Sequence, residues 1–293
     1  MKDLPDLLPD VALLTRQWAD TLCVRTDDEA DACRPYHRAW TTLRLIGAIS
    51  GARTDHAFFR QQFSAVAQAQ PRANVLIVGT ADHAMLHMVL AAFRAEEADP
   101  LVTIVDRCAT TLAANAWYAQ QVGAQATTHQ ADLRDIDAIA GERDLITTHS
   151  VFSFTQSEEF TPLFSALRGK LKPGGQLIFV QGLSPERRTG SRVRFSAEET
   201  LRFQQRALAC LAERGTVPGL DTALIQQLAY GFAVNKDIGA IAAAQDLLTP
   251  LSSAGFRLDQ VEQAERSDQV YRSSAPQQHE RSLSLRVVAT RID

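Results

Sequence analysis

The middle of the chain alternates short apolar runs with longer amphipathic stretches. Residues 74–78 form an apolar run that ends at Gly79, which is typical of a strand buried on both faces. Across residues 84–97, large apolar side chains recur three and four positions apart, which predicts a helix. A second apolar run, 102–105, ends at Asp106. A strand, a glycine turn, a helix and a strand that ends in a carboxylate predict the first half of a nucleotide-binding α/β unit.

The same alternation continues to residue 180. The pattern predicts a helix over 109–121, strands over 124–129 and 144–148, a helix that Ser157 caps and Lys-Pro-Gly-Gly (172–175) ends, and a strand over 176–180. Five strands that alternate with helices are typical of a parallel, doubly wound sheet.

Both flanks of this unit have a different pattern. The first seventy residues predict three helices, over about 7–23, over 36–49 with Gly51 as a stop, and after an N-cap at Asp55, with a polar loop at 26–35. After residue 182, a basic loop leads to helical stretches over about 196–214, 221–234 and up to 253. Two closing strands, 255–261 and 283–290, have no helix between them, which favours an antiparallel hairpin at the sheet edge.

Composition narrows the class of protein. The 293 residues are 45% hydrophobic and 22% charged, which allows a sizeable core. A net charge of -4 gives no electrostatic case for nucleic acid or membrane partners. The apolar runs are shorter than the ~18 residues that span a bilayer, and the acidic, proline-containing start does not resemble a signal peptide. We therefore expect a cytoplasmic protein.

The cysteines and two of the histidines are candidate metal ligands. The cysteines have no CxxC spacing, so we expect free thiols rather than a disulfide framework or a zinc site; they are Cys23, Cys33, Cys108 and Cys210. His83 and His87 are four residues apart, but Ala84 stands where a metalloprotease motif needs glutamate, and no third ligand is evident. The sequence predicts no metal site.

Seven segments carry a family resemblance, in this order: VLIVGTA (75–81), TIVD (103–106), ADL (131–133), DLITTHSVFSF (144–154), LKPGGQLIFV (171–180), AGFRLDQVEQ (254–263) and LSLRVVATR (283–291). Their order and spacing resemble class I S-adenosylmethionine-dependent methyltransferases, of the Rossmann-like methyltransferase superfamily. The resemblance implies an α/β fold with a Rossmann-like, doubly wound, seven-stranded sheet and an antiparallel closing hairpin. Residues 71–182 and 255–293 would form the cofactor-binding core, 1–70 an N-terminal helical region, and 183–254 a helical insertion or lid.

The resemblance also implies which residues contact the cofactor. Asp106 would bind the ribose hydroxyls, and Asp132 the adenine amino group. The full set is Gly79, Thr80, Ala81, Asp82, Asp106, Arg107, Asp132, Leu133 and His149. The turn departs from the family pattern, because Ala81 and His83 stand where glycines are usual and Ile77 where an acidic residue is usual. Asp82 could supply that carboxylate, facing the ammonium of the cofactor.

Candidate substrate residues lie in two places. His149 and Ser150 follow the fourth strand, where the family brings methyl group and acceptor together, and His149 could act as general base or simply be a satisfied polar residue. Tyr36, His37 and Arg44 could form a pocket wall, or the solvated face of a packed helix. The arginines of the basic loop favour an acidic substrate or a mobile cover over nucleic acid; they are Arg187, Arg188, Arg192 and Arg194.

These observations favour methyl transfer from S-adenosylmethionine to a small-molecule acceptor, at oxygen or nitrogen, with S-adenosylhomocysteine as product. A possible homodimer is the only macromolecular assembly expected, with no nucleic acid and no membrane. Two alternatives stay open. The irregular glycine turn suits a catalytically silent methyltransferase-like binding or partner protein. An NAD(P)-dependent dehydrogenase is disfavoured by the incomplete glycine fingerprint and by the closing strand pair.

Overall fold

A single mixed sheet organises the computed structural model, which describes residues 4–23, 30–265 and 283–293. The strand order is β3-β2-β1-β4-β5-β9-β8. The strands are β1 (Asn74–Val78), β2 (Leu101–Asp106), β3 (Ala126–Gln130), β4 (Arg143–His149), β5 (Leu171–Leu183), β8 (Phe256–Glu265) and β9 (Leu283–Arg291). Strands β1 to β5 pair in parallel, whereas β9 is antiparallel to both β5 and β8. The predicted seven-stranded sheet with an antiparallel closing hairpin is confirmed, with β9 inside and β8 at the edge.

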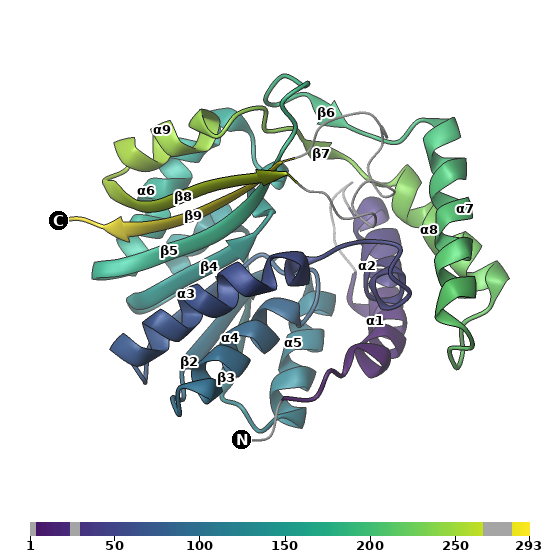
Figure 1. Cartoon of the computed structure of the whole chain (residues 1–293), viewed down its shortest axis with the longest axis horizontal. Helices are drawn as coiled ribbons and strands as arrows, with labels where there is room; N and C mark the ends of the chain where they lie inside the picture. Colours follow the sequence, from purple (N-terminus) through teal and green to yellow (C-terminus); the bar gives the residue numbers. More distant parts are fainter. Residues whose placement is uncertain (1–3, 24–29, 266–282) are drawn as a thin grey trace.

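Helices cover both faces of the sheet (Figure 1). One face carries α3 (His56–Ala69), α4 (Ala84–Ala95) and α5 (Ala109–Gln121), and the other carries α6 (Phe160–Lys170) and α9 (Gln245–Ser253). The side chain of Ile77 packs in the first layer, and Leu76 and Val78 pack in the second. Strand β1 is thus buried on both faces, which explains its unbroken apolar run.

A second group of helices lies beyond the carboxyl ends of the parallel strands (Figure 1). We call α1 (Leu8–Leu22), α2 (Ala30–Leu45), α7 (Ala197–Arg214) and α8 (Thr222–Val234) the helical cover. Helix α8 packs on α2 through a separate apolar cluster that includes Leu43, Phe203 and Phe232. Ser196 and Glu199 form a capping box that begins α7, where a helical stretch from about residue 196 was predicted. A two-stranded ribbon, β6 (Arg192–Val193) with β7 (Ile238–Gly239), connects this region to the sheet domain.

Helix α2 differs from its prediction at both ends. It begins at Ala30, inside the stretch 26–35 predicted as a loop, and residues 26–29 lie outside the described residues. Pro35 stands inside the helix, where it removes one backbone hydrogen bond. The helix continues because Tyr36, Trp40 and Leu43 pack in the cluster shared with α8. It ends at Leu45, so the predicted stop at Gly51 is wrong.

Two further boundaries were predicted wrongly. Gln156 and Glu159, not Ser157, form a capping box that begins a 3₁₀ turn before α6. Lys-Pro-Gly-Gly (172–175) lies within β5 and does not end a helix. Part of the predicted polar connection, 266–281, lies outside the described residues. Among the helices that the structure describes, none is both long and apolar enough to cross a membrane.

Candidate functional site

The candidate site lies where the strand order reverses. Strand β1 has β2 on one side and β4 on the other, so the connections that follow β1 and β4 leave in opposite directions. In open α/β sheets this arrangement creates a crevice at the carboxyl ends of the strands. Gly79, Asp106 and His149 all stand at the carboxyl ends of these strands. Ligands bind at such a switch point in open α/β sheets.

The turn after β1 is tight and is built on Gly79. Gly79 has a φ of 65°, which favours glycine, and its N–H donates to the carbonyl of Val105 at 2.9 Å. A Cβ at this position would come within 2.5 Å of Cγ2 of Val151, which follows β4. The next N–H, of Thr80, donates to Oδ2 of Asp106 at 2.8 Å. The turn therefore joins the ends of β1, β2 and β4.

Asp106 is a partly buried carboxylate that, among the described residues, is held by backbone amides. Its Oδ1 accepts the N–H of Cys108 at 2.7 Å, and its Oδ2 accepts that of Thr80. Burial raises the pKa of Asp106, although His37 and the two amides oppose the shift. Among the described residues, no Lys or Arg side chain forms an ion pair with it. Each oxygen keeps acceptor capacity, so the carboxylate can receive further donors such as hydroxyls.

Asp82, in contrast, is engaged by protein side chains. Its Oδ1 accepts from Nη1 of Arg44 at 3.0 Å, its Oδ2 accepts from Nε1 of Trp40 at 2.7 Å, and Oδ1 also accepts the N–H of Ala84. Burial alone would raise the pKa of Asp82, but Arg44 holds it below the usual value. Within the described ranges, Nε and Nη2 of Arg44 are buried without a hydrogen-bond partner. Arg44 thus balances the negative charge of Asp82 in the turn, and its Nε and Nη2 remain as N–H donors beside it.

His83 occupies a place where the family turn usually has glycine, and its ring is wholly buried. The ring packs over Tyr118 with 4.7 Å between ring centroids. Burial lowers the pKa of His83 to about 4, so the ring is neutral at pH 7. Its packing on α5 shows that this histidine belongs to the core beneath the turn.

Asp132 follows β3 and lies next to the end of β2, because the N–H of Ala131 donates to the carbonyl of Asp106 at 3.1 Å. Both oxygens of Asp132 accept from the guanidinium of Arg134 at 2.9 Å, and Nε of Arg107 lies 3.6 Å away. The hydrogen bonds from Arg134 outweigh partial burial and lower the pKa of Asp132. Leu133 begins the 3₁₀ turn Leu133–Ala138 that follows. Asp132 and Leu133 thus lie beside the end of β2 at the sheet edge, with the acid paired to arginine, and their contact with adenine stays a prediction.

His149 ends β4 and faces a buried carboxylate that the sequence analysis assigned elsewhere. Nε2 of His149 lies 3.3 Å from Oδ2 of Asp55. Oδ1 of Asp55 accepts from Oγ of Ser284 at 3.2 Å and from Nε of Arg286 at 3.0 Å. Asp55 is the N-cap residue of α3, as predicted, but its side chain makes no capping hydrogen bond there. No local pattern reveals this network, because the partners are 94 to 231 positions away.

Ser150 directs the chain from β4 back toward the glycine turn. It is one of the few described non-glycine residues with positive φ, at 58°, and its N–H donates to the carbonyl of Val180 at 2.8 Å. Such a conformation costs about 1 kcal/mol or more and occurs often at functional sites. It places Val151 directly against Gly79. Ser150 therefore brings the segment after β4 against the glycine turn.

The other predicted substrate residues lie on α2. Tyr36 stacks on Phe232 of α8 with 5.5 Å between ring centroids, and burial raises its pKa, with Asp82 and Asp106 adding to the shift. The ring of His37 lies edge-on to Tyr36, and its Nδ1 is turned toward the thiols of Cys23 and Cys33. From the basic loop, Arg192 and Arg194 form ion pairs with Asp237.

Comparison with known proteins identifies the fold. No family model and no curated protein matches the chain. A putative sarcosine dimethylglycine methyltransferase from Galdieria sulphuraria is similar in structure, with 12% identity over 82% of this chain and 86% of that chain and a TM-score of 0.52. The cyclase SpnF is similar with 14% identity over 80% of each chain and a TM-score of 0.51. The chain thus has the class I S-adenosylmethionine-dependent methyltransferase fold, as the resemblance implied. The two neighbours are named for different reactions, so the fold alone does not define the reaction.

Proposed function

We propose that this protein transfers a methyl group from S-adenosylmethionine to a nitrogen or oxygen of a small-molecule acceptor. One observation carries the proposal above the others. At the switch point, the N–H of Thr80 in the turn donates to a partly buried carboxylate, Asp106, that has no arginine or lysine ion-pair partner among the described residues. A desolvated acid without a cation is stabilised by hydroxyl donors, and a ribose supplies two of them.

The neighbouring groups fit the rest of this cofactor. The unpartnered Nε and Nη2 of Arg44 suit the carboxylate of its methionine part, because a guanidinium binds carboxylates through paired N–H groups. Asp132 and Leu133 suit the adenine ring, and Arg107 beside Asp132 lines the same edge. Thr80 and Ala81 continue the turn. When bound, the cofactor supplies a methyl group made electrophilic by a sulfonium.

His149 and Asp55 suit proton removal from the acceptor. Asp55 lies beside Arg286 and is an acceptor when ionised, so Nε2 of His149 carries the proton in their contact. This tautomer leaves the basic lone pair on Nδ1. His149 would then act as general base toward an N–H or O–H, with Asp55 fixing its ring orientation. Ser150 and Tyr36 are proposed as acceptor contacts on either side of the crevice.

A small acceptor is favoured by the helical cover. Helices α1, α2, α7 and α8 lie beyond the carboxyl ends of the parallel strands (Figure 1). Their apolar cluster around Phe232 can exclude water from the reacting atoms. A macromolecular acceptor would need an open face at this edge. Neither nucleic acid nor a membrane enters the proposal, and the cytoplasmic location and the homodimer stay predictions.

A second candidate, a catalytically silent binding protein, is favoured by a different observation. Asp82 and Asp132 both form ion pairs with arginine, so two of the three carboxylates predicted to contact cofactor are already neutralised. In that case the crevice would keep its fold without holding S-adenosylmethionine. The dehydrogenase alternative gains no support from the antiparallel pairing of β9 with β5 and β8.

Calorimetric titration separates these candidates. We expect the protein to bind both S-adenosylmethionine and S-adenosylhomocysteine. Titration with NADH should show no significant binding. Failure to bind either sulfur cofactor at ~1 mM, where the interaction free energy is only about 4 kcal/mol, overturns the methyltransferase proposal. Binding without transfer of labelled methyl groups to a panel of small amines, phenols and carboxylates would instead favour the silent protein.

A further inference from the structure

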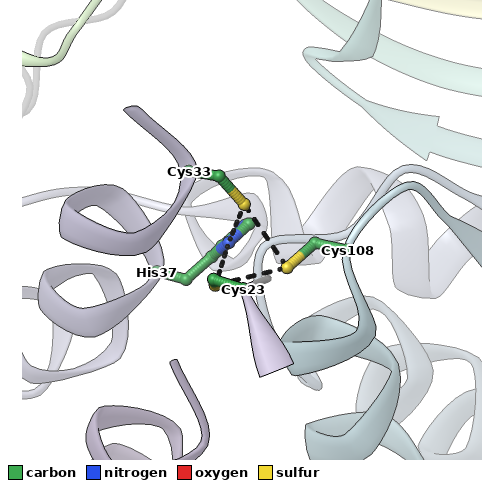
Figure 2. Close-up of side chains that lie close together, drawn as sticks. All are labelled: Cys23, Cys33, His37 and Cys108. Carbon is green, nitrogen blue, oxygen red and sulfur yellow. Dashed lines mark hydrogen bonds between the residues drawn. The ribbon is translucent and has the colours of Figure 1, made fainter. Parts of the chain in front are cut away.

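Three of the four cysteines and one histidine meet at a single point (Figure 2). Cys23 follows α1, Cys33 and His37 stand one turn apart on α2, and Cys108 is the N-cap residue of α5. Figure 2 shows all four side chains directed toward one another. Their ligand atoms, three Sγ atoms and Nδ1 of His37, all lie within 4.8 Å of one another. The fold therefore brings together residues that are up to 85 positions apart.

The separations within this cluster match a tetrahedral metal site. Sγ of Cys108 lies 3.5 Å from the Sγ atoms of both Cys23 and Cys33. Nδ1 of His37 lies 3.5 Å from Sγ of Cys23 and 3.3 Å from Sγ of Cys33. With Zn–S bonds of about 2.3 Å and a Zn–N bond of about 2.0 Å, tetrahedral zinc sets these separations at about 3.8 and 3.5 Å. Four of the six separations are therefore within about 0.3 Å of this geometry, and the other two are no longer than 4.8 Å.

The surroundings also suit a metal better than three ordinary buried thiols. Cys210, the fourth cysteine, behaves as a small apolar side chain and packs with Phe203 and Ala207. The clustered thiols instead face polar groups, and Oγ1 of Thr110 lies 3.1 Å from Sγ of Cys23. A hydroxyl at this distance can donate to a thiolate and support it as a ligand.

We propose that Cys23, Cys33, His37 and Cys108 form a structural zinc site. Soft thiolate ligands with an imidazole select zinc over the hard cations magnesium and calcium. All four coordination positions come from protein side chains, which is typical of structural rather than catalytic zinc. The metal would cross-link the end of α1, helix α2 and the start of α5. Cys108 also donates its N–H to Asp106, so the proposed zinc site adjoins the candidate cofactor site.

A disulfide is the main competing chemistry for this cluster. The Sγ atoms stand 3.5 Å apart, well beyond a bonded distance of about 2.05 Å. A disulfide would also use only two of the three sulfurs and would leave His37 without a role. The zinc proposal assigns His37, one of the predicted substrate residues, to the metal instead. It does not depend on methyl transfer, because its readouts are metal content and spectra.

The test measures bound metal in the full-length protein, produced in zinc-supplemented medium and purified under reducing conditions. We expect about one zinc per chain, as for a closed four-ligand site. Replacing the zinc by cobalt should give the visible absorption of tetrahedral, thiolate-ligated Co²⁺. Cys33→Ser and His37→Gln should reduce the zinc content several-fold and shift or abolish the cobalt spectrum. Cys210→Ser is the matched control and should retain both signals.

Three outcomes overturn the proposal. One is a folded, fully reduced wild-type protein that contains no zinc and takes up no cobalt. Another is thiol titration that shows a disulfide among the cluster cysteines in the metal-free protein as isolated. The third is equal zinc content in Cys33→Ser, His37→Gln and Cys210→Ser. If Cys33→Ser does not fold, the wild-type cobalt spectrum and His37→Gln still decide the question.

Discussion

Asp55 contacts His149 across 94 positions of sequence, with Oδ2 of the first residue 3.3 Å from Nε2 of the second. Asp55 lies just before α3, whereas His149 ends β4 at the crevice. Arg286 and Ser284 of β9 hold the other oxygen of Asp55. The contact therefore joins an N-terminal segment, the central sheet and the closing strand at the place where the acceptor is proposed to react.

Because of this contact, we expect substitutions at His149 and Asp55 to lower the rate of methyl transfer but not the affinity for the cofactor. His149→Ala should lower methyl transfer by about 10²-fold or more, because general-base catalysis typically contributes this much. Asp55→Asn should lower methyl transfer less, because the imidazole of His149 is still present as a base but is no longer held in one tautomer. Cofactor affinity should stay within about threefold of wild type in both variants. Single-turnover assays and calorimetry measure the two quantities.

Stability must be followed in the same variants. Asp55→Asn also weakens a buried ion pair with Arg286, so thermal unfolding is compared with that of Arg286→Met, which removes the same pair from the other side. Equal turnover in Asp55→Asn, Arg286→Met and wild type would reduce the network to a structural role. A loss that parallels the loss of folded protein would lead to the same conclusion.

Asp106 should control cofactor affinity. Hydrogen bonds to a charged group contribute about 1.5–3 kcal/mol each, so Asp106→Ala should raise the dissociation constant of S-adenosylhomocysteine by about 10- to 100-fold or more. The exposed Asp99, before the other end of β2, provides the control variant Asp99→Ala. Calorimetry on both variants, with circular dichroism to confirm folding, measures the effect. Unchanged affinity in Asp106→Ala would remove this carboxylate from the proposed site.

A side chain at Gly79 should destabilise the fold unless the neighbouring Val151 is made smaller. Gly79→Ala adds a methyl group at positive φ and 2.5 Å from Cγ2 of Val151, so we expect a loss of about 2–4 kcal/mol in the free energy of unfolding. Val151→Ala in the same chain should recover part of this loss by making room. Gly174 also has positive φ but has open space around it, so Gly174→Ala reports the backbone strain alone.

Urea unfolding of these variants gives the comparison directly. The contact between the two loops is supported if Gly79→Ala is clearly less stable than Gly174→Ala and if Val151→Ala rescues it. Equal losses for the two glycine variants, with no rescue, would mean that Val151 does not press on the turn.

Elements with a complete local signal were predicted closely. The helix over 109–121 matches α5 at both ends, and β1 matches its apolar run. Large residues of α5, such as Leu112 and Tyr118, pack on the sheet, and β1 is buried on both faces, so both signals are local. The start of α2 was missed because its stabilising contacts come from α8, which is distant in sequence. Propensity is a weak guide where tertiary packing stabilises a helix.

Site chemistry was harder to predict than the fold. The places of Gly79 and Asp106 followed from strand ends, which a parallel sheet brings to one edge. The partners of Asp55 and Asp82 could not be inferred, because each contact joins different layers of the fold. For the metal site one signal was available, the spacing of Cys33 and His37 by four residues, but the other ligands come from separate elements.

The buried ring of His83 makes the free energy of unfolding depend on pH. Both ring nitrogens lack a hydrogen-bond partner in the part of the chain that the structure describes. Burial lowers its pKa from 6.5 to about 4, while Asp82 raises it and Arg44 and His87 lower it. Between these two pH values the unfolded chain binds a proton that the folded chain does not. The contribution of a neutral His83 is therefore fully present above pH 6.5 and is lost as the pH falls toward 4.

We therefore expect His83→Leu to flatten the pH dependence of stability. Wild type should lose about 2 kcal/mol through this residue between pH 7 and pH 5, and the variant should not lose this part. Leucine has a similar size and needs no hydrogen bond, so the variant should be at least as stable as wild type at pH 5. Urea unfolding of both proteins at the two pH values cancels the contributions of all other groups. The same pH-dependent loss in His83→Leu and wild type would show that His83 does not titrate in this window.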